Sequence, residues 1–131
     1  MLNPSQFSPN EAWIFFKLNH APVVTELDGE FDVYTLMDAA SLYILSSGFI
    51  AAGSLDSADS EIRSLLGAAH SESSVWPEKI LVSQAASADK LVAEARAIDV
   101  PVVIAGEAEL SIFTNEARQE FRAHFGGGDL H

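Results

Sequence analysis

The most apolar and least interrupted part of the chain is the stretch of residues 30–53, and its pattern fits two templates. As strands, it contains three runs rich in β-branched, aromatic and aliphatic residues, at 33–37, 42–45 and 49–52. As a helix, it carries one apolar stripe at positions i, i+3, i+4, i+7 and i+8, formed by Leu36, Ala39, Ala40, Tyr43 and Ile44. Periodicity in so short a stretch does not decide between the two.

The residues just upstream favour strands. Asp28-Gly29 is a turn dipeptide, and it lies between two strand-like runs at residues 23–27 and 31–35. This arrangement is typical of a β-hairpin. We therefore predict an antiparallel meander over residues 23–52, with a helix over residues 35–46 as the alternative.

The N-terminal region begins with a helix-start signal. Ser8 can act as the N-cap, Pro9 stands at the first helical position, and Glu11 can complete a capping box. This predicts a helix over residues 9–18. Apolar residues are continuous from Ala12 to Phe16, however, so a strand over residues 13–18 is the alternative.

The second half of the chain alternates helical and strand patterns. We predict helices near residues 57–69, 87–98 and 115–125, a loop over residues 70–74, a buried strand at residues 79–82 and a further strand at residues 102–105. A strand, a helix and a second strand in this order form a βαβ unit. The whole chain, residues 1–131, is thus predicted to be one α/β domain with a mixed sheet, antiparallel in its first part and parallel in its second.

The charge is strongly acidic and unevenly placed, with a formal net charge of −12. The segment between Leu18 and Ile62 contains eight carboxylates and no Lys or Arg: Glu26, Asp28, Glu30, Asp32, Asp38, Asp56, Asp59 and Glu61. Nucleic acids are held mainly by cationic side chains, so we expect no nucleic-acid partner. An acidic surface either keeps the protein soluble or docks a basic partner.

Composition excludes several kinds of chemistry. The chain has no cysteine, so disulfides, thiolate zinc sites and cysteine nucleophiles are ruled out. The first residues lack the pattern of a signal peptide, and no apolar run approaches the roughly 20 residues that span a bilayer. We therefore expect a soluble, cytoplasmic protein that has no contact with membranes.

Asp28, Glu30 and Asp32 alternate along a predicted strand, which places the three carboxylates on one face. We interpret them as a solvated hairpin face and as a candidate interaction surface, with a divalent-cation site as the alternative. The histidines, His20, His70, His124 and His131, have no spacing typical of a metal site, and we expect neither a metal nor a cofactor.

Ser83, Gln84 and Ser87 follow a predicted parallel strand and precede a helix, which is where α/β sheets bind ligands. The loop lacks the glycines that let a phosphate approach the backbone. Helix capping and turn formation are therefore the alternative role of these residues.

The order of elements, antiparallel strands followed by a helix, a βαβ unit and a final helix, resembles the ribonuclease-H-like superfamily. Retroviral-type integrase and transposase cores belong to this superfamily. One local segment adds to the resemblance, because residues 35–45 read as an apolar run, Asp38, two variable residues, Ser41 and a second apolar run, as in many integrase cores. The resemblance covers residues 23–104.

The resemblance implies two-metal chemistry, with carboxylates on the first strand and at the end of the strand after the crossover helix. In this sequence Glu26 alone could serve on the predicted first strand, Ser83-Gln84 stand at the second position, and Asp38 is not one of the family's metal ligands. The resemblance therefore implies a degenerate active site.

Two functional hypotheses follow. The first is a non-catalytic interaction or scaffold domain whose partner is another protein, or a second copy of the chain bound through an exposed strand edge. The second is a metal-dependent phosphodiesterase of the ribonuclease-H-like type, with Glu26, Asp32 and either Glu116 or Glu120 as its carboxylates.

Overall fold

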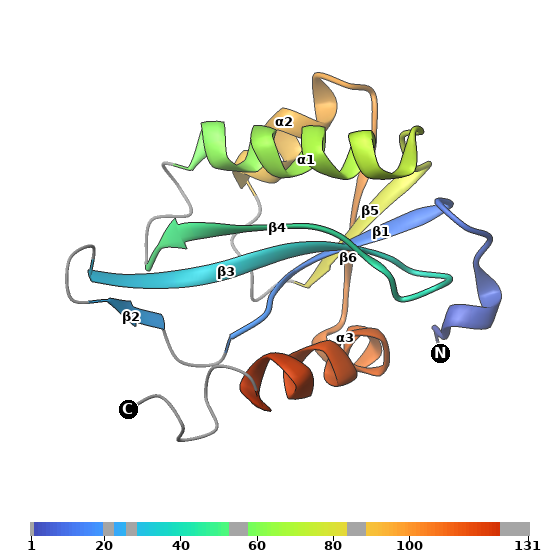
Figure 1. The fold of residues 1–131 in the computed structure, drawn as a ribbon. Coiled ribbons are helices and arrows are strands. Elements are labelled where there is room, and N and C mark those ends of the chain that lie inside the picture. Colours follow the sequence, from blue (N-terminus) through green and yellow to red (C-terminus); the bar gives the residue numbers. More distant parts are fainter. Residues whose placement is uncertain (1, 20–22, 26–28, 53–57, 84–88, 124–131) are drawn as a thin grey trace.

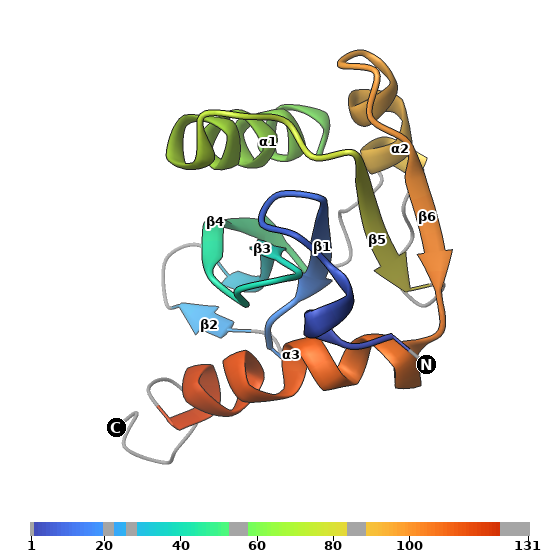
Figure 2. The ribbon, with the colours of Figure 1, turned by 90° about the vertical axis from the view of Figure 1, so that its right-hand side faces the viewer.

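A mixed sheet forms the middle layer of the protein, with helices on both faces (Figure 1). The structure is a computed structural model, and it describes residues 2–19, 23–25, 29–52, 58–83 and 89–123. Within these residues the sheet has six strands, α1 and α2 cover one face, and α3 covers the other (Figure 2). The predicted α/β class, with an antiparallel first part and a βαβ unit after it, is confirmed.

The elements follow one another along the chain in an order close to the predicted one. After a short 3-10 turn at Pro4–Gln6 come β1 (Ala12–Lys17), β2 (Val23–Thr25), β3 (Gly29–Asp38), β4 (Ile44–Ala51), α1 (Asp59–Ser73), β5 (Lys79–Ser83), α2 (Asp89–Arg96), β6 (Val102–Ala105) and α3 (Glu107–Phe121).

The strands are paired in the order β2-β3-β1-β5-β6, and β4 also pairs with β3. Phe31 of β3 pairs with Val23 of β2 and with Ala51 of β4, so β4 lies along the opposite side of β3 from β2. Within the described residues β2, β4 and β6 each pair with one neighbour and are therefore the edge strands of the sheet.

The central strand β1 corrects the predicted helix over residues 9–18. It pairs antiparallel with β3 and parallel with β5, and Ala12–Phe16 are all buried. The helix-start signal does form locally, since Glu11 Oε1 accepts the Ser8 N–H at 3.0 Å. Asn10 then takes a left-handed conformation with φ of 61°, which no continuing helix allows. The alternative strand over residues 13–18 was the better interpretation.

The meander of residues 23–52 is confirmed, and the alternative helix over residues 35–46 is wrong. β3 runs unbroken to Asp38, and a turn leads directly into β4. The predicted break at residues 46–48 does not occur, because β4 continues through it. Gly48 lies under α1, where a Cβ would meet the Leu65 side chain at 3.4 Å, an ordinary van der Waals distance.

Two helices extend beyond their predicted bounds. α1 continues to Ser73, so the predicted loop over residues 70–74 is mostly helix. α3 begins at Glu107 rather than near residue 115, and its first turn is capped by Glu109, whose Oε1 accepts the Gly106 N–H at 3.3 Å. α2 agrees with its prediction over Asp89–Arg96, while residues 87 and 88 lie outside the described part of the chain.

Alternation along the strands divides the core into two layers. The layer under α1 and α2 takes alternate residues of the central strands, including Trp13, Phe15, Tyr34, Leu36, Ile80 and Val82. The layer over α3 takes the intervening strand residues, including Ile14, Phe16, Val33, Met37 and Leu81, together with Phe113 of α3 itself. Both faces of the sheet are thus buried at its centre, which explains why β1 and β5 lack the apolar–polar alternation of a half-exposed strand.

One buried hydroxyl gives a direct test of this packing. Thr114 Oγ1, on the inner side of α3, is buried and has no hydrogen-bond partner among the described residues. Because an unsatisfied buried hydroxyl costs free energy, Thr114→Val should raise the free energy of unfolding by about 1 kcal/mol in urea denaturation.

Thr35→Val is the matched control, because Thr35 is equally buried but its Oγ1 lies 3.0 Å from Ser47 Oγ. This control should lower the free energy of unfolding by about 1 kcal/mol. Equal destabilisation by both substitutions would mean that α3 does not pack on the sheet as described.

Candidate functional site

The carboxyl ends of β1, β5 and β6 lie at one edge of the sheet, where α/β proteins commonly bind ligands. β1 supplies Lys17 there, on the same face as Trp13 and Phe15, and none of the residues Ala12–Lys17 is a carboxylate. β5 supplies Ser83, and β6 supplies Ala105. This edge is therefore poor in the hard oxygen ligands that Mg²⁺ or Mn²⁺ requires.

The three candidate ligand-loop residues are only partly described. Ser83 is buried and pairs with Ala105, and its alternation with Leu81 places it on the α3 face. Gln84 and Ser87 lie outside the described residues. Their role as a ligand loop stays a prediction.

The acidic series Asp28, Glu30 and Asp32 does not form the uniform solvated face that its alternation predicts. Glu30 is exposed and pairs with Val24, but Asp32 is only 8% exposed. Asp28 lies outside the described residues. The interpretation of Asp32 as a solvated side chain is wrong.

Asp32 is buried because it fixes the end of β1 against β3. Asn19 Nδ2 donates to Asp32 Oδ1 at 3.1 Å, and Asn19 Oδ1 accepts the Val33 N–H at 2.8 Å. Asp32 and Ser83 lie on opposite faces of the sheet, since Asp32 alternates with Tyr34 on the α1 face. The structure therefore does not bring Asp32 and Ser83 together.

The integrase-like segment has a structural explanation centred on Asp38. Asp38 is buried, its Oδ2 accepts the Ser41 N–H at 3.0 Å and the Ser41 hydroxyl at 2.6 Å, and its Oδ1 accepts the Asn10 N–H at 2.9 Å. The spacing of Asp38 and Ser41 thus shapes the β3–β4 turn and ties it to the residues before β1.

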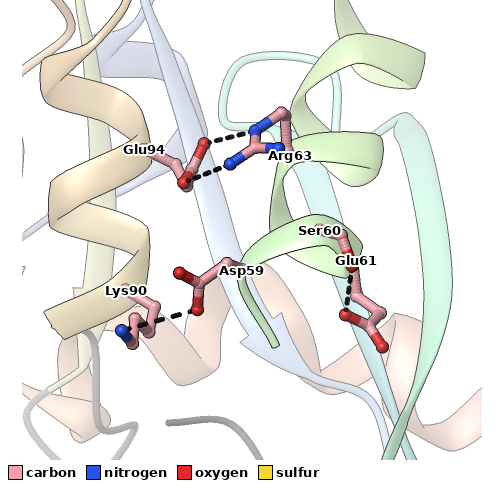
Figure 3. A network of polar contacts seen from close by, with 6 residues as sticks. All are labelled: Asp59, Ser60, Glu61, Arg63, Lys90 and Glu94. Atoms are coloured by element: carbon pink, nitrogen blue, oxygen red, sulfur yellow. Dashed lines mark hydrogen bonds and ion pairs between the residues drawn. The ribbon is translucent and has the colours of Figure 1, made fainter. Parts of the chain in front are cut away.

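Sequence analysis missed an ionic clasp between α1 and α2 (Figure 3). Arg63 binds Glu94 through two hydrogen bonds of 2.9 and 3.1 Å, and Lys90 lies 3.5 Å from Asp59. The hydrogen bond to Glu94 raises the pKa of the Arg63 guanidinium. No local pattern predicts this clasp, because its partners are about 30 positions apart and meet only once both helices have packed on the sheet.

The clasp and the buried side chains change the picture of the acidic segment. Of its eight carboxylates, Asp32 and Asp38 are buried and Asp59 is ion-paired. Glu30 and Glu61 are exposed, and the remaining three lie outside the described residues. The segment is therefore not one continuous acidic face.

Large apolar side chains are exposed on the edge strands β4 and β6, and also on β2, where Val24 is 71% exposed. On β6, Val103 is 42% exposed and Ile104 is 52% exposed. On β4, Phe49 is 63% exposed. Side chains of this kind on unpaired outer strands are typical of surfaces that bind other proteins.

Two further properties concern the described residues alone. They contain no group of three or more His, Asp or Glu side chains placed to hold a metal ion. None of their helices combines the length and the apolarity needed to cross a membrane.

Of the four histidines, His70 lies in the described part of the chain. Its ring stacks on the Trp76 ring, with the two ring centroids 4.2 Å apart, whereas His20, His124 and His131 lie outside this part.

No protein-family model and no curated protein matches this sequence. Among solved structures, the chain is similar to a chain of the simian T-cell lymphotropic virus intasome, whose cryo-EM structure was determined in complex with PP2A regulatory subunit B56 gamma. The TM-score is 0.59 at 11% sequence identity, and the match covers 95% of this chain and 45% of that chain. At this identity the likeness shows the fold alone, and it agrees with the ribonuclease-H-like resemblance of the sequence.

Asp38→Ala tests the role of the turn. It removes the acceptor of three hydrogen bonds, so the free energy of unfolding should fall by about 3 kcal/mol in urea denaturation. Ser41→Ala removes only the hydroxyl and should cost about 1 kcal/mol. If Asp38→Ala had no effect on stability, Asp38 would be free for a functional role.

The alkaline stability of the protein should depend on Tyr34. Burial, and then the nearby Asp32 charge, raise the pKa of Tyr34 above its ordinary value of 10.0. The folded state therefore holds this proton more tightly than the unfolded state, and its stabilising effect is complete below pH 10 and decreases as the pH rises further.

Tyr34→Phe should make the decline in unfolding free energy above pH 10 shallower, as measured by urea denaturation across the alkaline range. Tyr43→Phe is the comparison: Tyr43 is exposed, but its hydrogen bond to Glu72 raises its pKa as well, so this variant and the double variant Tyr34→Phe/Tyr43→Phe separate the contributions of the two tyrosines to the slope. The same alkaline slope in wild type and Tyr34→Phe would show that Tyr34 does not titrate differently in the folded state.

Proposed function

We propose that this chain is a non-catalytic protein-interaction domain built on a ribonuclease-H-like scaffold. The observation that carries the proposal is the exposure of large apolar side chains on edge strands of the sheet, Phe49 on β4 and Val103 with Ile104 on β6. A net charge of −12 favours a protein partner with basic residues over a nucleic acid.

The placement of the carboxylates supports a non-catalytic role. A two-metal site needs several carboxylates converging on one point, but β1 carries Lys17 where the sheet would offer a ligand to the carboxyl edge. A lysine at that position would repel a divalent cation. Asp38 is engaged in the β3–β4 turn, and Asp32 is hydrogen-bonded to Asn19.

The alternative, a metal-dependent phosphodiesterase, draws no support from the remaining candidates. Glu116 and Glu120 are exposed on α3, on the opposite side of the sheet from Asp32. Glu26 lies outside the described residues. A shared metal site for Asp32 and the α3 glutamates would require ligands to reach across the sheet.

The proposal is tested with the immobilised full chain at low ionic strength, with Phe49→Lys and Ile104→Lys alongside the wild type. We expect the wild type to retain a protein partner and at least one of the variants to lose it, because a lysine interrupts an apolar strand edge. Partner identity is read by mass spectrometry.

The same preparation is incubated with single- and double-stranded DNA and RNA in millimolar Mg²⁺ or Mn²⁺. We expect no cleavage. Hydrolysis that is lost on chelation, together with no retained protein, would overturn the proposal in favour of the phosphodiesterase.

A further inference from the structure

Among the described residues, the side of β6 that faces away from β5 is an unpaired backbone edge of the sheet. β6 is the last strand in the pairing order of the described residues, and its partner β5 lies on one side only. The Ile80 N–H donates to Pro101 O at 2.9 Å. Alternate residues of a parallel strand bond to the same neighbour, so the N–H and C=O groups of Val102 and Ile104 face away from β5.

The side chains of β6 add an apolar surface to these backbone groups. Val103 pairs with Leu81 and faces the α3 side, whereas Ile104 pairs with Val82 and faces the α2 side. Both are more than 40% exposed. The strand Val102–Ala105 contains no charged residue, and charges are a usual protection of outer strands against pairing.

Of the other edge strands, β2 has only three residues, Val23–Thr25. β4 is longer, but it is also less suited to accept a strand. Its middle is polar, with Ser46, Ser47 and Gly48, and Ser46 Oγ donates to Leu65 O of α1 at 2.8 Å. β4 therefore serves as a matched comparison for β6.

The charges near the β6 edge distinguish between two possible occupants, a second copy of this chain and a segment of a partner protein with basic residues. The exposed carboxylate Asp99 precedes the strand, and Glu107 and Glu109 follow it. In a symmetric antiparallel pairing of two copies centred on Val103, Asp99 of one copy would lie opposite Glu107 of the other. Arg118 pairs with Glu107 at 3.3 Å, which reduces but does not reverse this repulsion. Two chains that each carry a charge of −12 also repel at long range.

We propose that the open edge of β6 binds an extended segment of a partner protein, in which a short run of aliphatic residues is flanked by Lys or Arg. The aliphatic run adds a strand beside Val102–Ala105, and its side chains cover Val103 and Ile104. The flanking cations lie near Asp99 and Glu109. This inference rests on the proposed function and specifies where and how the partner binds.

The probe is a fluorescently labelled synthetic peptide with alternating valine and isoleucine between lysines at both ends. Binding to the full chain is measured by fluorescence anisotropy, beside a peptide with glutamates in place of the lysines. We expect the lysine peptide to bind about tenfold more tightly than the glutamate peptide, with a difference that shrinks as salt is added. Equal binding of both peptides would overturn the charge argument.

Ile104→Lys should weaken binding of the lysine peptide about tenfold, because it removes apolar contact and adds a like charge. Ile112→Lys makes the same exchange at an isoleucine of α3 that is 43% exposed, and it should leave binding unchanged. Urea denaturation of both variants checks that they fold. Unchanged binding by Ile104→Lys, or loss of binding by Ile112→Lys alone, would place the site elsewhere.

Hydrogen exchange gives a readout that does not depend on a variant. Peptide binding should slow exchange of the Val102 and Ile104 amides, which face outward, and leave that of Val103 unchanged. Retarded exchange on β4 instead of β6 would overturn the inference.

The outcomes separate this inference from the proposed function. If the immobilised chain retains a protein partner equally with wild type and Ile104→Lys, the domain binds proteins but not through β6. If neither peptide nor protein binds, both proposals fail. If sedimentation shows that the chain dimerises and Ile104→Lys abolishes the dimer, the occupant of the edge is a second copy and the basic segment is wrong.

Discussion

The pairing of β1 with a strand on each side holds the two halves of this fold together. β3 joins β1 antiparallel and brings the N-terminal meander, and β5 joins it parallel and brings the βαβ unit. With α1 and α2 over one face and α3 below the other, the side chains of Ala12–Phe16 pack in both core layers (Figure 2). A strand buried on all sides contributes much to stability, because every apolar side chain leaves water and every backbone group between the pairs is bonded.

The burial of β1 also determines what remains for function. The centre of the sheet is filled with apolar side chains, and the described carboxylates near it are used in folding. Asp38 forms the β3–β4 turn, and Asp32 fixes the end of β1 through Asn19. Unpaired backbone groups and exposed apolar side chains are instead found together at the edges of the sheet, as on β6. Such an edge can bind a strand of another protein.

Sequence patterns predicted most of the fold where local and tertiary preferences agree. The stripe Ile62, Leu65, Leu66 and Ala69 predicted α1, and the turn dipeptide predicted the pairing of β2 with β3. The N-terminal region failed because its helix-start bond forms, but β3 and β5 then impose a strand on residues whose apolar run fits either structure. The start of α3 was missed because its cap is Gly106 held by Glu109, without a Ser, Thr, Asp or Asn at the N-cap.

The candidate site was less predictable than the fold. Alternation correctly placed Glu30 and Asp32 on one face of a strand. It did not predict that Asp32 is buried, because Asp32 is covered by Asn19, which follows β1 and reaches Asp32 once β1 and β3 have paired. The exposure of Val103 and Ile104 could not be predicted from the sequence either, because a central strand and an edge strand can have the same run of aliphatic residues. Position in the sheet order, which only the assembled topology supplies, separates the two.

The most direct test of this account is native-state hydrogen exchange of the free chain, resolved to single amides. Amides of β1 bonded to β3 and β5 should exchange most slowly, and only through global unfolding, while the outward amides of Val102 and Ile104 should exchange fast under native conditions. If the β1 amides exchanged as fast as these outward amides of β6, the sheet would not be organised around β1. If Val102 and Ile104 were as protected as β1 in the free monomer, the β6 edge would already be covered and could not be the docking strand.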